Sequence, residues 1–483
     1  MKRDFGLRGA SRRDFVKSVL TASAALGLGP TRALEILDQI GGSALAQAAN
    51  VSRRSVNIVA GQGALSWFTL VWPAPRVITG FQASFAYDDP TKAIKSTSAA
   101  LEGRSLYTRG VNGQALWSKY GDRKLVSAML CGVNTGHETA PKNGNNSNTI
   151  PDGVGGAVGM FAASAAIQST LNALVPVIGI KSANDSSDMP FGRAPGAPSP
   201  ASVANASSMV GLFSSAASRL ANRLQQKTNQ DLFSEYYRAL LGLTRTADRI
   251  AYARAQADSR VAVDLLAKNL GSQLQPAAGQ VNMWCGNAAP ANEKVDAMAQ
   301  ALIVTANAFK LNLTAQVNIP VFMDDPHGAF AGGNAGPAKI ADQIVSILEN
   351  FMAELDGTAD SSNPGKKLSD GVVITVSGDL PKFCFDRNNW PDNSPQNANW
   401  IYVMSQGRVK PGWFGDITTT TKTNYDPATG VMDSGSVKTT DKVVLDGALA
   451  SVLYAVTGGD DRRVRDFTTA VSYQGLINPL VTG

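Results

Sequence analysis

The chain has 483 residues, of which 44% are hydrophobic and 17% are charged, and its formal net charge at pH 7 is +6. This composition is typical of a globular protein with a lightly charged surface, and it excludes a disordered, collagen-like or coiled-coil chain. His137 and His327 are the only histidines in the sequence. A metal site with three histidine ligands is therefore excluded.

The N-terminus carries an export signature. Ser11-Arg12-Arg13-Asp14-Phe15 begins a twin-arginine pattern, and an apolar stretch of small residues follows over 16–29. Because this stretch is shorter than the ~20 residues of a membrane-spanning helix, we expect a twin-arginine signal peptide over 1–49. The implied partner is the twin-arginine translocase, and the mature chain, without a transmembrane span, is expected in the periplasm or outside the cell.

The positive charge is concentrated in this signal. Residues 1–46 hold seven Lys and Arg and four Asp and Glu, so they account for +3 of the total charge of +6 and leave about +3 for the mature chain. Such a small charge gives no indication of nucleic-acid binding.

The three cysteines, Cys131, Cys285 and Cys384, have no C-x-x-C spacing and are odd in number. They indicate neither a zinc knuckle nor a disulfide framework. Two interpretations stay open, namely one disulfide with a leftover thiol, or three small apolar core residues.

Hydrophobic patterning predicts alternating strands and helices. In chain order, we expect strands over 56–60 and 124–133, a helix over 157–174, a strand over 175–180, helices over 216–226, 230–266 and 293–309, a strand over 314–322, a helix over 338–355, strands over 371–377 and 400–404, and a helix over 445–456. A Gly-rich turn over 61–64 follows the first strand. Such apolar strands alternating with helices predict an α/β fold with a mostly parallel central sheet and helices on both of its faces.

Two segments interrupt this alternation. The stretch 190–208 is rich in Pro and Gly and predicts an exposed loop, after which helices dominate. We therefore expect a single domain over 50–483 with a helical insertion at about 209–312. A second insertion, at about 416–442, is rich in Thr, Lys, Gly and Asp and predicts a polar hairpin.

Polar loops follow or precede three of the predicted strands. Asp325 and His327 come after the strand 314–322, Asp379 follows the strand that ends at Ser377, and Asp392 precedes the strand 400–404. Ligands of open parallel sheets gather at the carboxyl ends of the strands. An Asp and a His two residues apart can bind one cation, but a solvated turn explains them equally well.

The order of these pieces resembles the exported "domain of unknown function 1501" proteins, which are sulfatase-like members of the alkaline-phosphatase superfamily. The resemblance rests on the signal, the first strand with its Gly turn, Asp325-x-His327, the strand ending in Ser377, the Asp392 loop and Val409-Lys410-Pro411-Gly412-Trp413. It is strongest over 299–459. It implies an alkaline-phosphatase-like fold with one or two divalent metals at the carboxyl edge of the sheet and a Ser, Thr or Cys nucleophile.

Carried over position by position, the resemblance implies that several ligands are lost. Ser66 stands where the family has its first-strand metal Asp. The family's Ser-Glu-Phe-Gly-Arg reads Ser377-Gly378-Asp379-Leu380-Pro381, so the Glu is missing and Asp379 is the neighbouring acid. Asn393 replaces the His that follows Asp392.

The nucleophile would be Thr139 or Ser147, in the loop after the strand 124–133, with His137 and Glu138 beside them. The remaining Asp325, His327 and Asp392 could hold one ion, and their oxygen-rich set suits Ca²⁺ or Mg²⁺ better than Zn²⁺. No cofactor is firmly implied.

Three functions follow as hypotheses. The favoured one is a catalytically degenerate protein that acts as a binding or assembly component of the cell envelope. The second is a metal-dependent phosphate or sulfate ester hydrolase with a reduced single-metal site. The third is a self-associating extracellular structural protein, suggested by the low surface charge and the Thr-rich insertion, whose edge strands could pair with a second copy.

Overall fold

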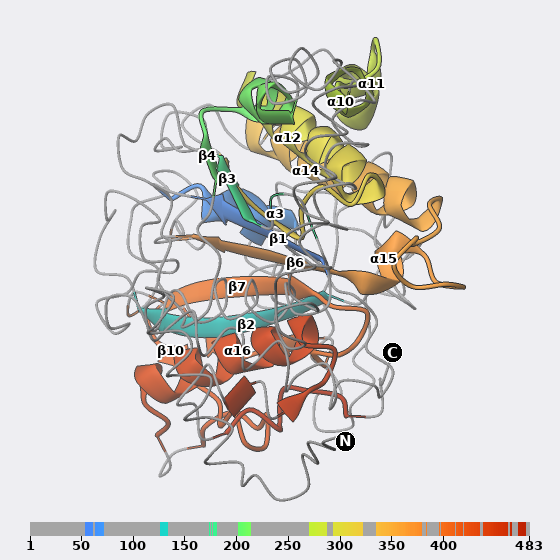
Figure 1. Cartoon of the computed structure of the whole chain (residues 1–483). Coiled ribbons are helices and arrows are strands. Elements are labelled where there is room, and N and C mark those ends of the chain that lie inside the picture. Colours follow the sequence, from blue (N-terminus) through green and yellow to red (C-terminus); the bar gives the residue numbers. More distant parts are fainter. Residues whose placement is uncertain are drawn as a thin grey trace, which may run out of the picture.

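A computed structural model of the chain describes residues 54–60, 63–71, 126–133, 173, 175, 177–180, 201–213, 270–286, 293–321, 335–378, 383, 396, 398–410, 412–418, 420–434, 438–461, 464–465 and 472–479. The described part is a mixed α/β structure with one large sheet and helices packed against it (Figure 1). No helix among these residues has the length and apolarity to cross a membrane.

The large sheet has eight strands in the order β4-β3-β5-β1-β6-β7-β2-β8. Their bounds are β1 Arg54–Ala60, β2 Val126–Val133, β3 Val177–Ile180, β4 Ala201–Val203, β5 Gln316–Val321, β6 Val372–Gly378, β7 Ala398–Met404 and β8 Gly412–Phe414. Every neighbouring pair is parallel except the two that involve β7, which runs against both β6 and β2. The expected mostly parallel sheet is confirmed.

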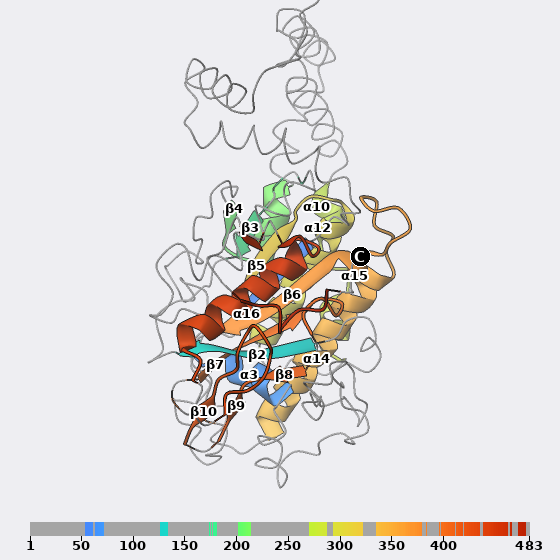
Figure 2. The same cartoon turned by 90° about the horizontal axis from the view of Figure 1, so that it is seen from below.

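The helices of the described residues are α3 Leu65–Val71, α10 Leu270–Leu274, α11 Gln280–Trp284, α12 Glu293–Lys310, α14 Ala335–Asp356, α15 Leu368–Gly371 and α16 Asp441–Val456, with a further helix over 206–213. α14 packs against α3 and α12, whereas α16 packs on β2 and β6. Figures 1 and 2 show α16 on the opposite side of the sheet from α12 and α14.

The strand register assigns side chains to the two faces. Ser451 of α16 donates a hydrogen bond to the sulfur of Met129 on β2, at 3.5 Å, so Met129 points toward α16. Met129 lies opposite Ile401, and Ile401 lies opposite Ser377. These side chains belong to one face, which we call the α16 face. Because side chains alternate along a strand, Ile374 and Val376 point toward the other face.

The predicted strands over 56–60, 124–133, 175–180, 314–322, 371–377 and 400–404 correspond to β1, β2, β3, β5, β6 and β7, and the predicted helices over 293–309, 338–355 and 445–456 correspond to α12, α14 and α16. The helices predicted over 216–226 and 230–266, and nearly all of the one over 157–174, lie outside the described residues. The loop prediction over 190–208 is wrong at its end, since β4 and the start of the 206–213 helix occupy it.

The polar segment after β8 forms an antiparallel pair, β9 Asp416–Ile417 with β10 Lys422–Thr423, followed by a bridge between Tyr425 and Met432. Two hydrogen bonds link this segment to Asp441, the first residue of α16. Asp441 accepts from the side chains of Lys422 at 2.5 Å and of Asn424 at 2.8 Å.

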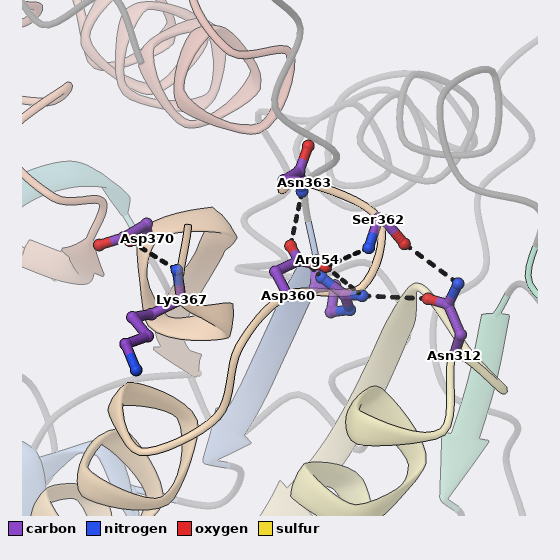
Figure 3. A network of polar contacts seen from close by, with 7 residues as sticks. All are labelled: Arg54, Asn312, Asp360, Ser362, Asn363, Lys367 and Asp370. Carbon is purple, nitrogen blue, oxygen red and sulfur yellow. Dashed lines mark hydrogen bonds and ion pairs between the residues drawn. The ribbon is translucent and has the colours of Figure 1, made fainter. Parts of the chain in front are cut away.

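A fully buried ion pair anchors the first residue of the central strand β1 (Figure 3). The Arg54 guanidinium donates to both carboxylate oxygens of Asp360, at 2.9 and 3.2 Å, and also to Asn312 Oδ1 at 3.0 Å. Asp360 further accepts from the amide nitrogen of Ser362 at 2.9 Å and from the side chain of Asn363. The pair therefore ties β1 to the turn after α14 and to the end of α12.

The variant Asp360→Asn should be strongly destabilised, because it leaves the Arg54 charge buried without a counter-charge. We expect a loss of about 3–5 kcal/mol in the free energy of unfolding, measured by urea denaturation. The matched control is Asp446→Asn, which removes the acid of the solvent-facing Lys442–Asp446 pair and should cost less than about 1 kcal/mol. Equal losses in the two variants would contradict the anchoring role.

Candidate functional site

The carboxyl ends of three parallel strands meet at one edge of the sheet, where ligand sites of such sheets gather. Ala60, the last residue of β1, is the register partner of Val321 at the end of β5 and of Gly378 at the end of β6. The start of β7 adjoins the same edge, because β7 runs in the opposite direction.

The turn after β1 is stabilised by a hydrogen bond between two of its own residues. Gly63 has a φ of 82°, a left-handed conformation that favours glycine, and α3 begins two residues later. Ser66 lies in the first turn of this helix with 1% of its surface exposed, and its hydroxyl donates to the carbonyl oxygen of Gly63 at 2.7 Å. The residue that the resemblance aligns with a metal-binding Asp thus points back into its own turn.

Gly378 has no room for a side chain. A Cβ atom at this position would lie 2.0 Å from the carbonyl oxygen of Ala60 and 3.3 Å from the Cβ of Leu65. The Gly378 carbonyl in turn accepts a hydrogen bond of 2.8 Å from the buried side chain of Asn399. At the position that the resemblance aligns with the family's Glu, the backbone of Ala60 therefore fills the space that a side chain would need.

The predicted site residues Asp325, His327, Asp379, Asp392, Thr139 and Ser147 all lie outside the described residues, as do His137 and Glu138. The structure therefore neither brings them together nor separates them. Within the described ranges, no group of three or more His, Cys, Asp and Glu side chains is arranged to hold a metal ion.

A buried polar row that the sequence did not single out crosses the centre of the sheet. Thr375 Oγ1 donates to Asn57 Oδ1 and Asn57 Nδ2 donates to Asn318 Oδ1, both at 2.7 Å. Gln316 Nε2 reaches the same Asn318 oxygen at 3.4 Å. All four residues are at most 4% exposed, and the register places them on the α16 face.

This row consists of amides and one hydroxyl, without an acid or a base, so it has no means of activating a nucleophile. Asn318 Nδ2 is buried and makes no hydrogen bond. Since a slip by one residue would point every member of a strand to the other face, the row favours one register of β5, β1 and β6. Alternating polar residues at 55, 57, 316 and 318 were the available signal in the sequence.

Cys285 is a free thiol with 1% exposure. Its sulfur lies 3.6 Å from Asp296 Oδ1. Burial, and then the Asp296 carboxylate, raise the pKa of the Cys285 thiol to about 12, so the thiol stays protonated and is not a nucleophile at neutral pH. For Cys285 the interpretation as a buried core residue holds, while the side chains of Cys131 and Cys384 lie outside the description.

The variant Gly378→Ala should be destabilised by about 1–3 kcal/mol, because the added methyl group collides with the Ala60 carbonyl. Urea denaturation measures this loss. The matched control is Gly211→Ala, in the helix over 206–213, where a Cβ meets no atom within 4 Å. Alanine is favoured there by roughly 0.5–1 kcal/mol, so the two variants should shift in opposite directions. An unchanged free energy of unfolding in Gly378→Ala would show that the carboxyl edge has room for a side chain at this position.

No family model, curated protein or solved structure matches this chain. The likeness to the "domain of unknown function 1501" proteins therefore rests on the motifs quoted above, and the metal site that it implies stays a prediction.

Proposed function

We propose that the chain is an exported, alkaline-phosphatase-like protein without phosphatase or sulfatase chemistry, which serves the cell envelope as a binding or assembly component. The supporting observation is the packing at the carboxyl edge of the sheet. At position 378 the backbone of β1 fills the space of the family's Glu, and at position 66 a serine hydroxyl is bound to its own turn.

The chemistry explains why these two positions matter. A divalent ion that activates a nucleophile needs several anionic or imidazole ligands, which both hold the ion and lower the pKa of the group bound to it. A serine hydroxyl and a glycine supply neither charge nor a strong ligand. Asp325, His327, Asp379 and Asp392 are the remaining candidates, and they would have to bind the ion without these two positions.

Metal content and ester hydrolysis test this proposal on the exported protein. After gel filtration, we expect less than stoichiometric Ca²⁺, Mg²⁺, Mn²⁺ and Zn²⁺ by elemental analysis, and no turnover of aryl phosphate or aryl sulfate. A stoichiometric ion and ester turnover that are both lost in His327→Ala, with Thr139→Ala or Ser147→Ala also inactive, would overturn the proposal in favour of a single-metal hydrolase.

The export part of the proposal has its own test. The double variant Arg12→Lys, Arg13→Lys should remain in the cytoplasm, because the arginine pair is the recognised feature of the signal. The control is Arg3→Lys, Arg8→Lys, which makes the same change outside the motif and should leave export intact. Cell fractionation with immunodetection measures both, and equal export of the two double variants would contradict the signal.

The self-association alternative rests on strands of the Thr-rich insertion that could pair with a second copy. Among the described residues, this insertion contributes the strands β9 and β10 with two residues each, and strands this short offer few backbone groups for pairing. Size-exclusion chromatography of the exported protein is expected to give no open-ended assembly.

A further inference from the structure

Two buried arginines lie at the amino edge of the sheet, opposite the carboxyl edge discussed above. Arg54 opens β1 and is the register partner of Val372, the first residue of β6. Arg408 lies in the loop after β7, where the Gln406 side chain donates to the Val372 carbonyl. The exposed fractions of Arg54 and Arg408 are 0% and 2%.

The two arginines differ in their counter-charge. Arg54 is held by both oxygens of Asp360 (Figure 3). Arg408 has no carboxylate oxygen within 4.0 Å among the described residues. Its NH1 group reaches the amide oxygen of Gln406 at 3.5 Å. The Nε atoms of both arginines are buried without a hydrogen-bond partner, so the counter-charge alone distinguishes Arg408 from Arg54.

The backbone holds Arg408 in this place. Its amide nitrogen donates to the Ser405 carbonyl at 3.2 Å, its carbonyl accepts from Asn478 at 2.7 Å, and Val409 forms a bridge with Ile477. The C-terminal segment 472–479 therefore holds the backbone of the loop in place at residues 408 and 409.

Burial does not remove the charge. Desolvation lowers the pKa of the Arg408 guanidinium to about 10, while the fields of Tyr454 and Asp370 act against this shift. Arg408 thus stays protonated at pH 7. Asp370 itself is committed to α15, since its Oδ2 accepts from the Lys367 amide nitrogen at 2.9 Å. A buried cation without a partner costs free energy, and such costs are typical of positions kept for function.

We propose that Arg408 is the receptor of a single carboxylate group supplied by a ligand, which binds at the amino edge of the sheet between the 405–410 loop, α15 and the end of α16. A carboxylate matches the two parallel N–H donors of a guanidinium, as Asp360 does at Arg54. One negative charge balances one positive charge, whereas a doubly charged phosphate would add an excess charge beside Asp370. The inference is independent of the proposed function, which concerns the other edge.

The first test uses formate, the smallest carboxylate. The urea midpoint of the exported protein should rise with sodium formate and saturate, relative to sodium chloride at the same ionic strength, because a ligand of the native state stabilises it. Arg408→Met should lose this rise, and the control Lys442→Met, which removes an exposed cation, should keep it. Sodium phosphate should give a smaller difference between wild type and Arg408→Met than formate does.

The second test needs no ligand. Arg408→Met should raise the urea midpoint in chloride buffer, since it replaces an unpaired buried charge by an apolar chain of similar length. Arg54→Met should lower it, because Asp360 would lose its partner. If Arg408→Met does not fold, Arg408→Lys takes its place in the formate titration. Binding of formate to the wild type is then also measured directly, as broadening of the ¹³C-formate NMR signal. An unchanged midpoint in formate for wild type, or the same rise in wild type and variant, would overturn the proposal.

Discussion

The buried contact between Arg54 and Asp360 fixes the middle of the molecule. β1 is the central strand, with β5 on one side and β6 on the other, and its first residue is tied to the turn that separates α14 from α15. Two charges buried in apolar surroundings are tolerated only as a pair. The first residue of β1 and the turn after α14 can therefore be buried only together. The position of β6, which starts shortly after that turn, depends on the same contact.

The two edges of the sheet have different characters. At the carboxyl edge, Gly378 lies against Ala60 and the Ser66 hydroxyl is bound to its turn, so the described part of this edge is tightly packed and neutral. At the amino edge, Arg54 is paired with Asp360, whereas Arg408 has no carboxylate oxygen within 4.0 Å among the described residues. Between them, the row from Thr375 to Gln316 holds the strands in register. The buried arginine without a bonded carboxylate thus lies away from the carboxyl edge, where ligand sites of such sheets are expected.

The strands were the predictable part of the fold, because runs such as Val372 to Val376 are both β-branched and continuously apolar. The reversal of β7 was not predictable, since an apolar run carries no direction and only its partners define it. α3 and β4 were missed because they are short and next to Gly and Pro. For the site, Ser66 and Gly378 were singled out by resemblance alone, and the crowding at Gly378 needs coordinates. Arg408 gave no signal, because burial of a charge cannot be seen in a loop sequence.

The polar row also says something about the order in which the chain can fold. Asn57 bonds to Asn318 and to Thr375, partners that lie 261 and 318 residues later in the chain. The central strand is thus synthesised early but finds its neighbours only after most of the chain has been made, and pairings this distant in sequence fold slowly. During synthesis its apolar edges need protection from other chains. If the proposed twin-arginine signal is used, the chain would form these pairings before export, because that route carries folded proteins.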